Sequence, residues 1–285
     1  MALNTYQFQF GSFQFGGTNS PYQIQSIDGL EALPDLRTQD DNRGYNDGMF
    51  SGRDFLSGRT ITMEIFTFAG NGNSAMVNFD LLQQALIPQT NGTTTLQFLL
   101  SQYDTEKQIN TRVRGRRTTV DKEYTFGYIR SQYTFFCPDP RYYSNTATTV
   151  VMAANVASLG RTYNRTYNMT YGGGSLVNSA TINNVGWVTT YPTITVNGPV
   201  TSPTVGNLTT GQYITVNTSL TNTDSLVIDL DQKLVTLNGS PVRNLVAGNS
   251  QWFGAAPGTS NFYFTGGSLV GGVTAASVTY RSAYI

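Results

Sequence analysis

Apolar and polar residues alternate with a period of two along several stretches of the chain, which is the pattern of strands with one buried face. In the clearest stretch, residues 59–68, Ile61, Met63 and Ile65 would face a core, and the polar residues between them would face outward. Similar alternation predicts strands near residues 6–10, 13–15, 22–27, 94–100, 107–114 and 124–136. The first half of the chain is therefore expected to be mainly β.

A single stretch has the helical period instead. Its apolar residues recur at spacings of four, three and four and would form one core-facing stripe, made of Ala75, Phe79, Leu82 and Leu86. Asn73 and Ser74 are residue types that cap helix N-termini, and Pro88 cannot continue a helix. We therefore expect one α-helix, at about residues 74–87.

Residues 38–58, between the third and fourth predicted strands, are polar and rich in glycine. Loops of this length inside a compact domain tend to be functional or disordered. We expect a long loop or a projecting arm, and its acidic residues are Asp40, Asp41, Asp47 and Asp54.

A basic cluster begins in the predicted strand 107–114. Period-two alternation would place Asn110, Arg112, Arg114 and Arg116 on one face of that strand. Such a cluster could bind phosphates, or it could be a solvated strand edge whose charges block unwanted pairing. The chain has zero net charge, which disfavours nucleic acid as a partner. We interpret the cluster as a contact with the acidic arm of another copy.

The strand that ends near residue 136 is followed by Pro138, Asp139, Pro140 and Arg141. Neither proline can donate to a β-ladder, and each restricts the preceding residue to extended conformations. Of the 17 basic and 17 acidic residues, 12 and 14 respectively precede residue 142, so the composition changes here. We expect a stiff joint between two domains, residues 1–141 and residues 142–285.

The expected second domain contains short β-branched and aromatic runs separated by Gly, Asn or Pro. Asn197-Gly198 and Asn238-Gly239 are turn dipeptides, because both residue types tolerate positive φ. Regular short strands without a helix signal predict a β-sandwich or jelly roll. Trp187 and Trp252 could stack on a sugar ring there, although a lone tryptophan in a sandwich more often packs in the core or at the rim.

Residue types exclude most catalytic and metal chemistry. The chain has no histidine and one cysteine, Cys137. This removes the usual general base, every Ser-His or Cys-His nucleophile, a disulfide within the chain and a cysteine-based zinc site. Asp229 and Asp231 could form a glycosidase pair, but we favour a hairpin turn for them. We expect no enzyme activity, no cofactor and no metal ion.

Charged residues make up only 12% of the chain, and apolar residues make up 39%. Sparse charge and zero net charge protect a surface poorly against association, so much of this surface is expected to lie against other copies or partners. The N-terminus lacks a basic segment followed by an apolar core, and the longest apolar run, residues 150–154, is too short to span a membrane. We expect neither secretion nor membrane insertion.

Several segments stand out when their order and spacing are taken together. They include the passage from the polar arm into the strongest strand, the Asp-Pro-Arg-x-Tyr junction, and the turns and tryptophan of the second domain, at residues 56–65, 137–144, 184–199, 228–239, 252–258 and 279–284. In this order they resemble the distal tail proteins of long, flexible-tailed bacteriophages, in particular the minor tail proteins of phages of actinobacteria. The resemblance covers nearly the whole chain.

This resemblance implies a structural protein of the virion, made in the host cytoplasm and placed at the distal end of the tail. The N-terminal domain, a β-sandwich or barrel-like fold with one helix, would form a ring, commonly a hexamer, and the C-terminal domain would be a galectin-like β-sandwich. The ring would join the tail tube protein to the tail-tip hub and tape-measure proteins and to receptor-binding proteins. A lumen that passes DNA should not be strongly basic, which favours a place between subunits for the arginine cluster.

The alternative is a carbohydrate-binding adhesion module that acts through the C-terminal sandwich. The residues by themselves support a two-domain β protein that binds or assembles, so both functions stay open at this point.

Overall fold

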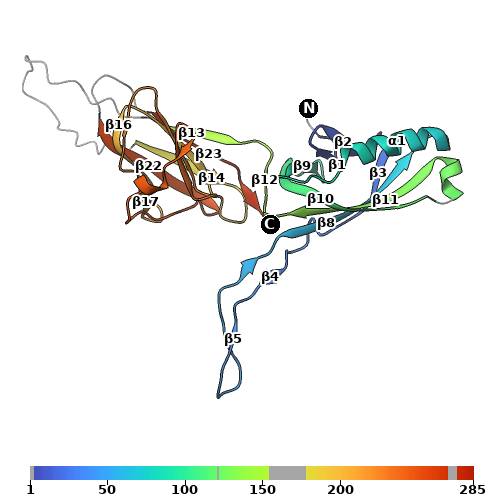
Figure 1. Ribbon diagram of the computed structural model, residues 1–285, viewed down its shortest axis with the longest axis horizontal. Helices are drawn as coiled ribbons and strands as arrows, with labels where there is room; N and C mark the ends of the chain where they lie inside the picture. Colours follow the sequence, from blue (N-terminus) through green and yellow to red (C-terminus); the bar gives the residue numbers. More distant parts are fainter. Residues whose placement is uncertain (1–2, 121, 154–177, 269–274) are drawn as a thin grey trace, which may run out of the picture. The chain divides into compact units, whose positions relative to one another are not determined.

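The structure, a computed structural model, describes residues 3–120, 122–153, 178–268 and 275–285 (Figure 1). The chain divides into two compact units, of which the first comprises Met1–Thr146 with Tyr284–Ile285 and the second comprises Ala147–Ala283. The chain therefore passes between the units twice. Strands predominate in both units and the described residues contain one α-helix, so the predicted mainly β fold is confirmed.

A nine-stranded sheet forms the first unit and takes in β24 at the end of the chain. Seven strands follow the order β2-β1-β9-β10-β11-β8-β3, while β12 pairs with β10 and with β24. The strands are β1 (Gln7–Phe10), β2 (Phe13–Gly16), β3 (Tyr22–Asp28), β8 (Arg59–Phe68), β9 (Thr94–Leu99), β10 (Lys107–Thr119), β11 (Tyr128–Cys137), β12 (Tyr142–Ser144) and β24 (Ala283–Tyr284).

The predicted alternation of β8 is confirmed, because Ile61, Met63 and Ile65 are buried in the core of the first unit. The predicted start of β11 at residue 124 was wrong, since the 3₁₀ turn η1 (Lys122–Phe126) precedes it. Gly127 separates the two with a φ of +85°, and a Cβ there would lie 2.1 Å from the Ala69 carbonyl oxygen. The chain turns sharply at a position that only glycine fits.

Helix α1 (Gly72–Ala85) begins two residues earlier than predicted. Asn71 is its N-cap, because the Asn71 side chain accepts a hydrogen bond from the backbone N–H of Ser74 at 2.9 Å. The expected cap at Asn73 and Ser74 was therefore wrong. The expected apolar stripe is confirmed, since its four members, Ala75, Phe79, Leu82 and Leu86, are buried.

Two short ribbons form a projecting arm, residues 36–56, between β3 and β8. In the first ribbon β4 (Leu36–Arg37) pairs with β7 (Phe55–Leu56), and in the second β5 (Asp41–Asn42) pairs with β6 (Met49–Phe50). Figure 1 shows this hairpin leading away from the end of β8.

Two sheets form the second unit, and side chains from both enclose one apolar core. The six-stranded sheet has the order β13-β23-β15-β19-β20-β21, and the five-stranded sheet has the order β14-β22-β16-β17, with β18 beside β16. The strands are β13 (Thr148–Ala153), β14 (Asn178–Asn184), β15 (Thr193–Asn197), β16 (Val200–Asn207), β17 (Gln212–Thr215), β18 (Ser219–Leu220), β19 (Ser225–Asp229), β20 (Leu234–Leu237), β21 (Ser240–Pro241), β22 (Gly258–Ser268) and β23 (Ala275–Tyr280). A 3₁₀ turn, η2 (Arg243–Leu245), follows β21.

One of the two predicted turn dipeptides of the second unit closes a hairpin. Asn238 and Gly239 join β20 to β21 with φ angles of +50° and +82°, as their residue types predict. The other dipeptide, Asn197-Gly198, joins β15 to β16, which lie in different sheets, and neither of its residues has a positive φ, so that prediction was wrong.

Between β19 and β20, the Asp229 carboxylate accepts from the backbone N–H groups of Asp231 and Gln232 at 2.9 and 3.0 Å. The predicted turn role of these aspartates is confirmed.

Candidate functional site

The arm is a ribbon without a core of its own. Every residue from 36 to 55 is exposed, and Tyr45, Met49 and Phe50 expose 102%, 52% and 62% of their surface. A two-stranded ribbon by itself is only marginally stable in water. The side chains of the arm are therefore available to another molecule.

Arginines cover the two phenylalanines of the arm. The Cζ atoms of Arg37 and Arg53 lie 5.4 and 5.3 Å from the ring centroid of Phe55, and the Cζ of Arg43 lies 5.1 Å from that of Phe50. These cation–π contacts hold each arginine beside a ring, and Phe50 nevertheless stays 62% exposed.

The aspartates of the arm lack a partner of opposite charge. Among the described residues, no ion pair includes Asp40, Asp41, Asp47 or Asp54. Asp40 instead accepts a hydrogen bond from the backbone N–H of Gly52 at 2.8 Å, which ties the two sides of the arm together.

The root of the arm is held by one buried guanidinium, that of Arg59, which is 2% exposed. Its Nε donates to the carbonyl oxygen of Pro140 at 3.0 Å, and its Nη1 donates to three carbonyl oxygens that precede the arm, those of Gly29, Leu30 and Ala32. Burial lowers the pKa of the guanidinium below its ordinary value, although Tyr142 acts in the opposite direction. Arg59 thus connects the arm with the proline segment.

Sequence analysis missed this role of Arg59, although a signal was present. Alternation along β8 places Arg59 in the same phase as Ile61 and Met63, on the face that packs into the core. A charged residue on a core face must find several hydrogen-bond partners, so its phase alone marks it as a structural anchor.

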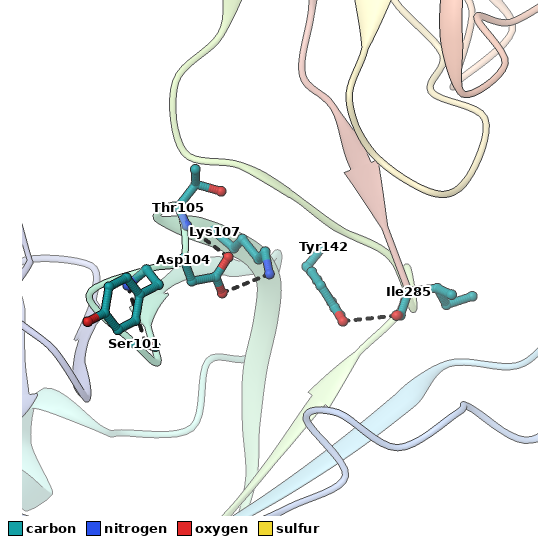
Figure 2. A network of polar contacts seen from close by, with 7 residues as sticks. Ser101, Asp104, Thr105, Lys107, Tyr142 and Ile285 are labelled. Atoms are coloured by element: carbon teal, nitrogen blue, oxygen red, sulfur yellow. Dashed lines mark hydrogen bonds and ion pairs between the residues drawn. The ribbon is translucent and has the colours of Figure 1, made fainter.

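The end of the chain returns to the first unit beside Tyr142 (Figure 2). The Tyr142 hydroxyl donates to the backbone carbonyl oxygen of Ile285 at 2.9 Å. The rings of Tyr142 and Tyr284 stack with centroids 6.1 Å apart. Lys107 places its Nζ 5.6 and 5.0 Å from these two ring centroids and forms an ion pair with Asp104 at 2.9 Å. Burial raises the pKa of Tyr142. Tyr284 is therefore part of the first unit's core, and Ile285 is tied to it through the hydroxyl of Tyr142.

A β-bulge divides the basic cluster of β10 between two faces. The register with β11 shifts between Val113 and Gly115, so that Arg114 is the extra residue. Arg112 pairs with Phe136 before the bulge, and Arg117 pairs with Gln132 after it. The Cζ atoms of Arg112 and Arg114 lie 5.7 and 3.5 Å from the Phe136 ring centroid, on the face away from the core.

Arg116 lies on the opposite face, because it pairs with the buried Tyr133. Burial raises the pKa of Tyr133, and Arg116 acts in the opposite direction. The prediction that Arg112, Arg114 and Arg116 share one face was wrong for Arg116. The bulge reverses the alternation of faces along β10, and its position cannot be read from the sequence of this strand alone. Arg112, Arg114 and Arg117 together form what we call the outer arginine row.

Open strand edges flank the central part of the first sheet. Residues 112–119 of β10 pair with β11 only, because β9 and β12 pair with β10 no further than Thr111. At the other side, β3 has β8 as its one neighbour in the sheet order. Within the described residues, both edges carry unpaired backbone groups that could accept another strand.

The outer face of this sheet carries two shallow depressions. One, of about 270 Å³, is polar and lined by Glu64, Phe66, Arg117, Arg130 and Gln132, among others. The other, of about 620 Å³, is lined mainly by the aromatic residues Phe66, Phe68, Phe126 and Tyr128. Arg130 pairs with Glu123 at 2.9 Å, whereas none of the described ion pairs includes a residue of the outer arginine row.

The proline segment lies inside the first unit, which extends to Thr146, beyond the expected boundary at residue 141. The Asp139 carboxylate accepts from the Arg141 backbone N–H at 3.1 Å and from the Tyr143 hydroxyl at 2.6 Å. Pro138 is exposed and Pro140 is half-buried. Polar contacts across Pro140 thus hold Asp139 to Arg141 and Tyr143, which follow this proline.

Trp187 and Trp252 of the second unit have different environments. Trp187 is 64% exposed, and its backbone N–H donates to the Ala283 carbonyl oxygen at 2.9 Å. Trp252 is partly buried and packs against the core of the second unit. Of the two, Trp187 has the ring surface that a stacking ligand would need.

The strands of one sheet of the second unit contain no charged residues. Its strands β14, β16, β17, β18 and β22 contain no Asp, Glu, Lys or Arg. Tyr263 and Tyr213 flank Gly206 on one row of this sheet, and a Cβ at Gly206 would lie 2.5 Å from the Tyr263 ring. The Tyr213 hydroxyl accepts from the Asn249 side-chain amide at 3.0 Å.

The described part of the chain contains no group of three or more His, Cys, Asp or Glu side chains arranged to hold a metal ion. None of its helices combines the length and the apolar character that a membrane crossing requires.

Comparison with known protein families gives a match for part of the second unit. Residues 185–284 match the family model of the siphovirus-type tail component, C-terminal domain. No curated protein sequence matches the chain.

Solved structures resemble the chain over nearly its whole length. The SPP1 Dit (gp 19.1) protein, described as a paradigm of the hub adsorption apparatus in phages that infect Gram-positive hosts, aligns with a TM-score of 0.66 and 14% identity and covers 99% of this chain and 100% of its own. Two structures of the phage P2 baseplate in its activated conformation, with Ca and with Sr, align with TM-scores of 0.49 and 0.46 at 13% and 14% identity, each covering 96% of this chain and 97% of its own. The chain thus has the fold of SPP1 Dit, and its residues 185–284 carry the tail-component match.

Proposed function

We propose that the chain is a distal tail protein of a long-tailed bacteriophage, a structural hub at the end of the tail. The observation that carries this proposal is the fold shared with SPP1 Dit over 99% of the chain. The tail-component match at residues 185–284 supports it independently from sequence. That the phage infects actinobacteria stays a prediction.

The first unit is proposed to form the ring of this hub. Its sheet has an open edge at β3 and another at residues 112–119 of β10. Two different complementary edges on one chain produce a head-to-tail contact, which closes into a ring when the rotation between copies fits. The hexamer expected from the family resemblance stays a prediction.

Its proposed partners are those of a connector. The ring would bind the tail tube protein on one side and the tail-tip hub and tape-measure proteins on the other, and the second unit would lead to the receptor-binding proteins. The role needs binding surfaces but no catalysis, no cofactor and no recognition of nucleic acid. The protein would be made in the host cytoplasm and end in the virion tail.

Imaging of the purified full-length chain tests this proposal. Negative-stain microscopy and light scattering should find closed rings with a central opening at assembly concentrations. Antibody-gold labelling of virions should mark the end of the tail distal to the head. A chain that stays monomeric at all concentrations, or labelling along the tail shaft, would contradict the proposal.

A second candidate, carbohydrate binding by the second unit, is favoured by the charge-free sheet. Neutral sugars are recognised by aromatic faces with hydroxyl and amide groups nearby, and Tyr213, Tyr263 and Asn249 supply these groups. A glycan array with the full-length chain tests this function. Loss of binding in Tyr213→Ala would locate the site at the charge-free sheet, and loss in Trp187→Ala would locate it at the exposed tryptophan. An array without any binding would contradict this second function and leave only the structural role.

A further inference from the structure

We propose that the arm of one copy lies across the outer sheet face of a second copy, where its aspartates pair with the outer arginine row. This inference rests on the proposed ring and names the contact that joins its subunits. It involves Asp40, Asp41 and Asp47 on the arm and Arg112, Arg114 and Arg117 on β10.

The first step concerns the arm itself. Its strands pair only with each other, all residues from 36 to 55 are exposed, and Tyr45, Met49 and Phe50 present apolar surface to water. A ribbon of this kind gains little from its own contacts and becomes stable when another surface covers it. In Figure 1 the arm leads away from the strands of its own unit, so those strands do not cover it.

Charge identifies the covering molecule as a second copy. The distal part of the arm, residues 38–50, contains Asp40, Asp41 and Asp47 and a single cation, Arg43, which already stacks on Phe50. The outer arginine row presents three cations without an ion pair among the described residues. Unpaired charges of opposite sign on two elements of one chain make copies complementary to each other, and such complementarity fixes the register of a contact.

The bulge restricts the contact to one face. It leaves Arg112 and Arg114 beside Phe136 and turns Arg117 to the same side, whereas Arg116 points to the side of Tyr133. Phe136 lies beside these arginines and is half-buried, so its exposed part can pack against the apolar side chains at the tip of the arm. Arg116 carries the same charge, lies on the same strand and is exposed, but it is on the opposite face. It is therefore a matched control for the outer arginine row.

Charge exchange gives the first test. Arg112→Glu, Arg114→Glu and Arg117→Glu combined should raise the concentration at which rings form at least about tenfold, because close charge pairs across an interface contribute strongly to affinity. The arm variant Asp40→Lys, Asp41→Lys, Asp47→Lys should have the same effect, and the two sets in one chain should restore rings. Arg116→Glu should assemble like the unchanged chain. Circular dichroism confirms that each variant is folded.

Mixed cross-linking gives the second test and separates the contact from the ring. One copy carries Asp47→Cys with one affinity tag, and another carries Arg114→Cys with a different tag. Mild oxidation should yield a disulfide-linked species that contains both tags, while the pairing of Asp47→Cys with Arg116→Cys should not. The native Cys137 is buried, so it does not interfere.

The outcomes distinguish this inference from the proposed function. Rings that form without the two-tag species, and that tolerate both charge-reversal sets, would overturn the arm contact and leave the hub intact. A chain that stays monomeric and forms no cross-link would overturn both.

Discussion

The guanidinium Nε of Arg59 donates to the carbonyl oxygen of Pro140 over 3.0 Å, although 81 residues separate them in the sequence. The same side chain holds three carbonyl groups at the root of the arm and lies with its Cζ 5.4 Å from the Tyr142 ring centroid. One buried cation therefore contacts the root of the arm, the proline segment and the aromatic side chain of Tyr142, on which Tyr284 stacks.

Replacing Arg59 tests this anchor. Arg59→Met keeps much of the apolar stem but leaves four carbonyl groups without their donor. The bond to Leu30 is buried and the other three are partly buried, and an unsatisfied buried group costs about 1–3 kcal/mol. We expect a loss of about 2–3 kcal/mol in the free energy of unfolding and faster proteolysis at the arm. Urea denaturation and limited trypsin digestion measure both. Arg53→Met, on the exposed arm, is the control, and an unchanged urea midpoint in Arg59→Met would refute the anchoring role.

Tyr284 gives a prediction about the end of the chain. Its ring is 7% exposed and stacks on Tyr142 within the first unit. Truncation of a buried aromatic side chain costs about 3–5 kcal/mol, so Tyr284→Ala should destabilise the first unit by that order. Thermal unfolding followed by tyrosine fluorescence measures the effect. Tyr45→Ala, which removes a fully exposed ring, should leave the midpoint unchanged.

The N-cap of α1 is Asn71 in the structure, whereas the sequence suggested Asn73. Asn71 accepts from the Ser74 N–H, so Asn71→Ala should lower the free energy of unfolding by about 1 kcal/mol. Asn73, the cap expected from the sequence, lies within α1, and Asn73→Ala should have no such cost. Chemical denaturation of both variants decides between them. Equal destabilisation by the two substitutions would mean that Asn71 is not the cap.

Local patterns explain how much of the fold the sequence could predict. The alternation in β8 and the stripe of α1 each depend on residues close in the chain, and both predictions were confirmed. The turn at Asn238 and Gly239 follows from residue types that tolerate positive φ. These elements need no knowledge of what packs against them.

The rest depended on contacts between distant residues. The bulge at Arg114 arises from the register with β11, so the face of Arg116 could not be counted from β10 alone. The return of Tyr284 to Tyr142 and the bond between Arg59 and Pro140 likewise join segments far apart. The basic cluster of β10 could therefore be recognised from the sequence, but the face of each arginine could not.

Cys137 gives a pH-dependent prediction. The thiol is fully buried, and this burial raises its pKa from 9.0 to about 11. The folded state therefore keeps the proton between those values while the unfolded chain loses it, so stability is unaffected below pH 9 and falls as the pH rises towards 11. At pH 10 the loss is about 1 kcal/mol.

Comparison with Cys137→Ala isolates this effect from the tyrosines whose pKa is also raised. The difference in free energy of unfolding between the two proteins should shrink by about 1 kcal/mol from pH 8 to pH 10. Urea denaturation across this range measures it. A difference that stays constant with pH would show that the thiol titrates normally in the folded protein.

The proline segment allows a test of the proposed joint. Pro138→Gly and Pro140→Gly combined release two fixed φ angles, while the carbonyl of residue 140 remains to accept from Arg59. If the segment sets only the orientation of the second unit, rings should form unchanged in negative stain, and proteolytic cleavage near residues 138–147 should become faster. Pro241→Gly, in β21 of the second unit, is the control. Loss of the rings would instead place the segment in the ring wall, which its position inside the first unit makes a real alternative.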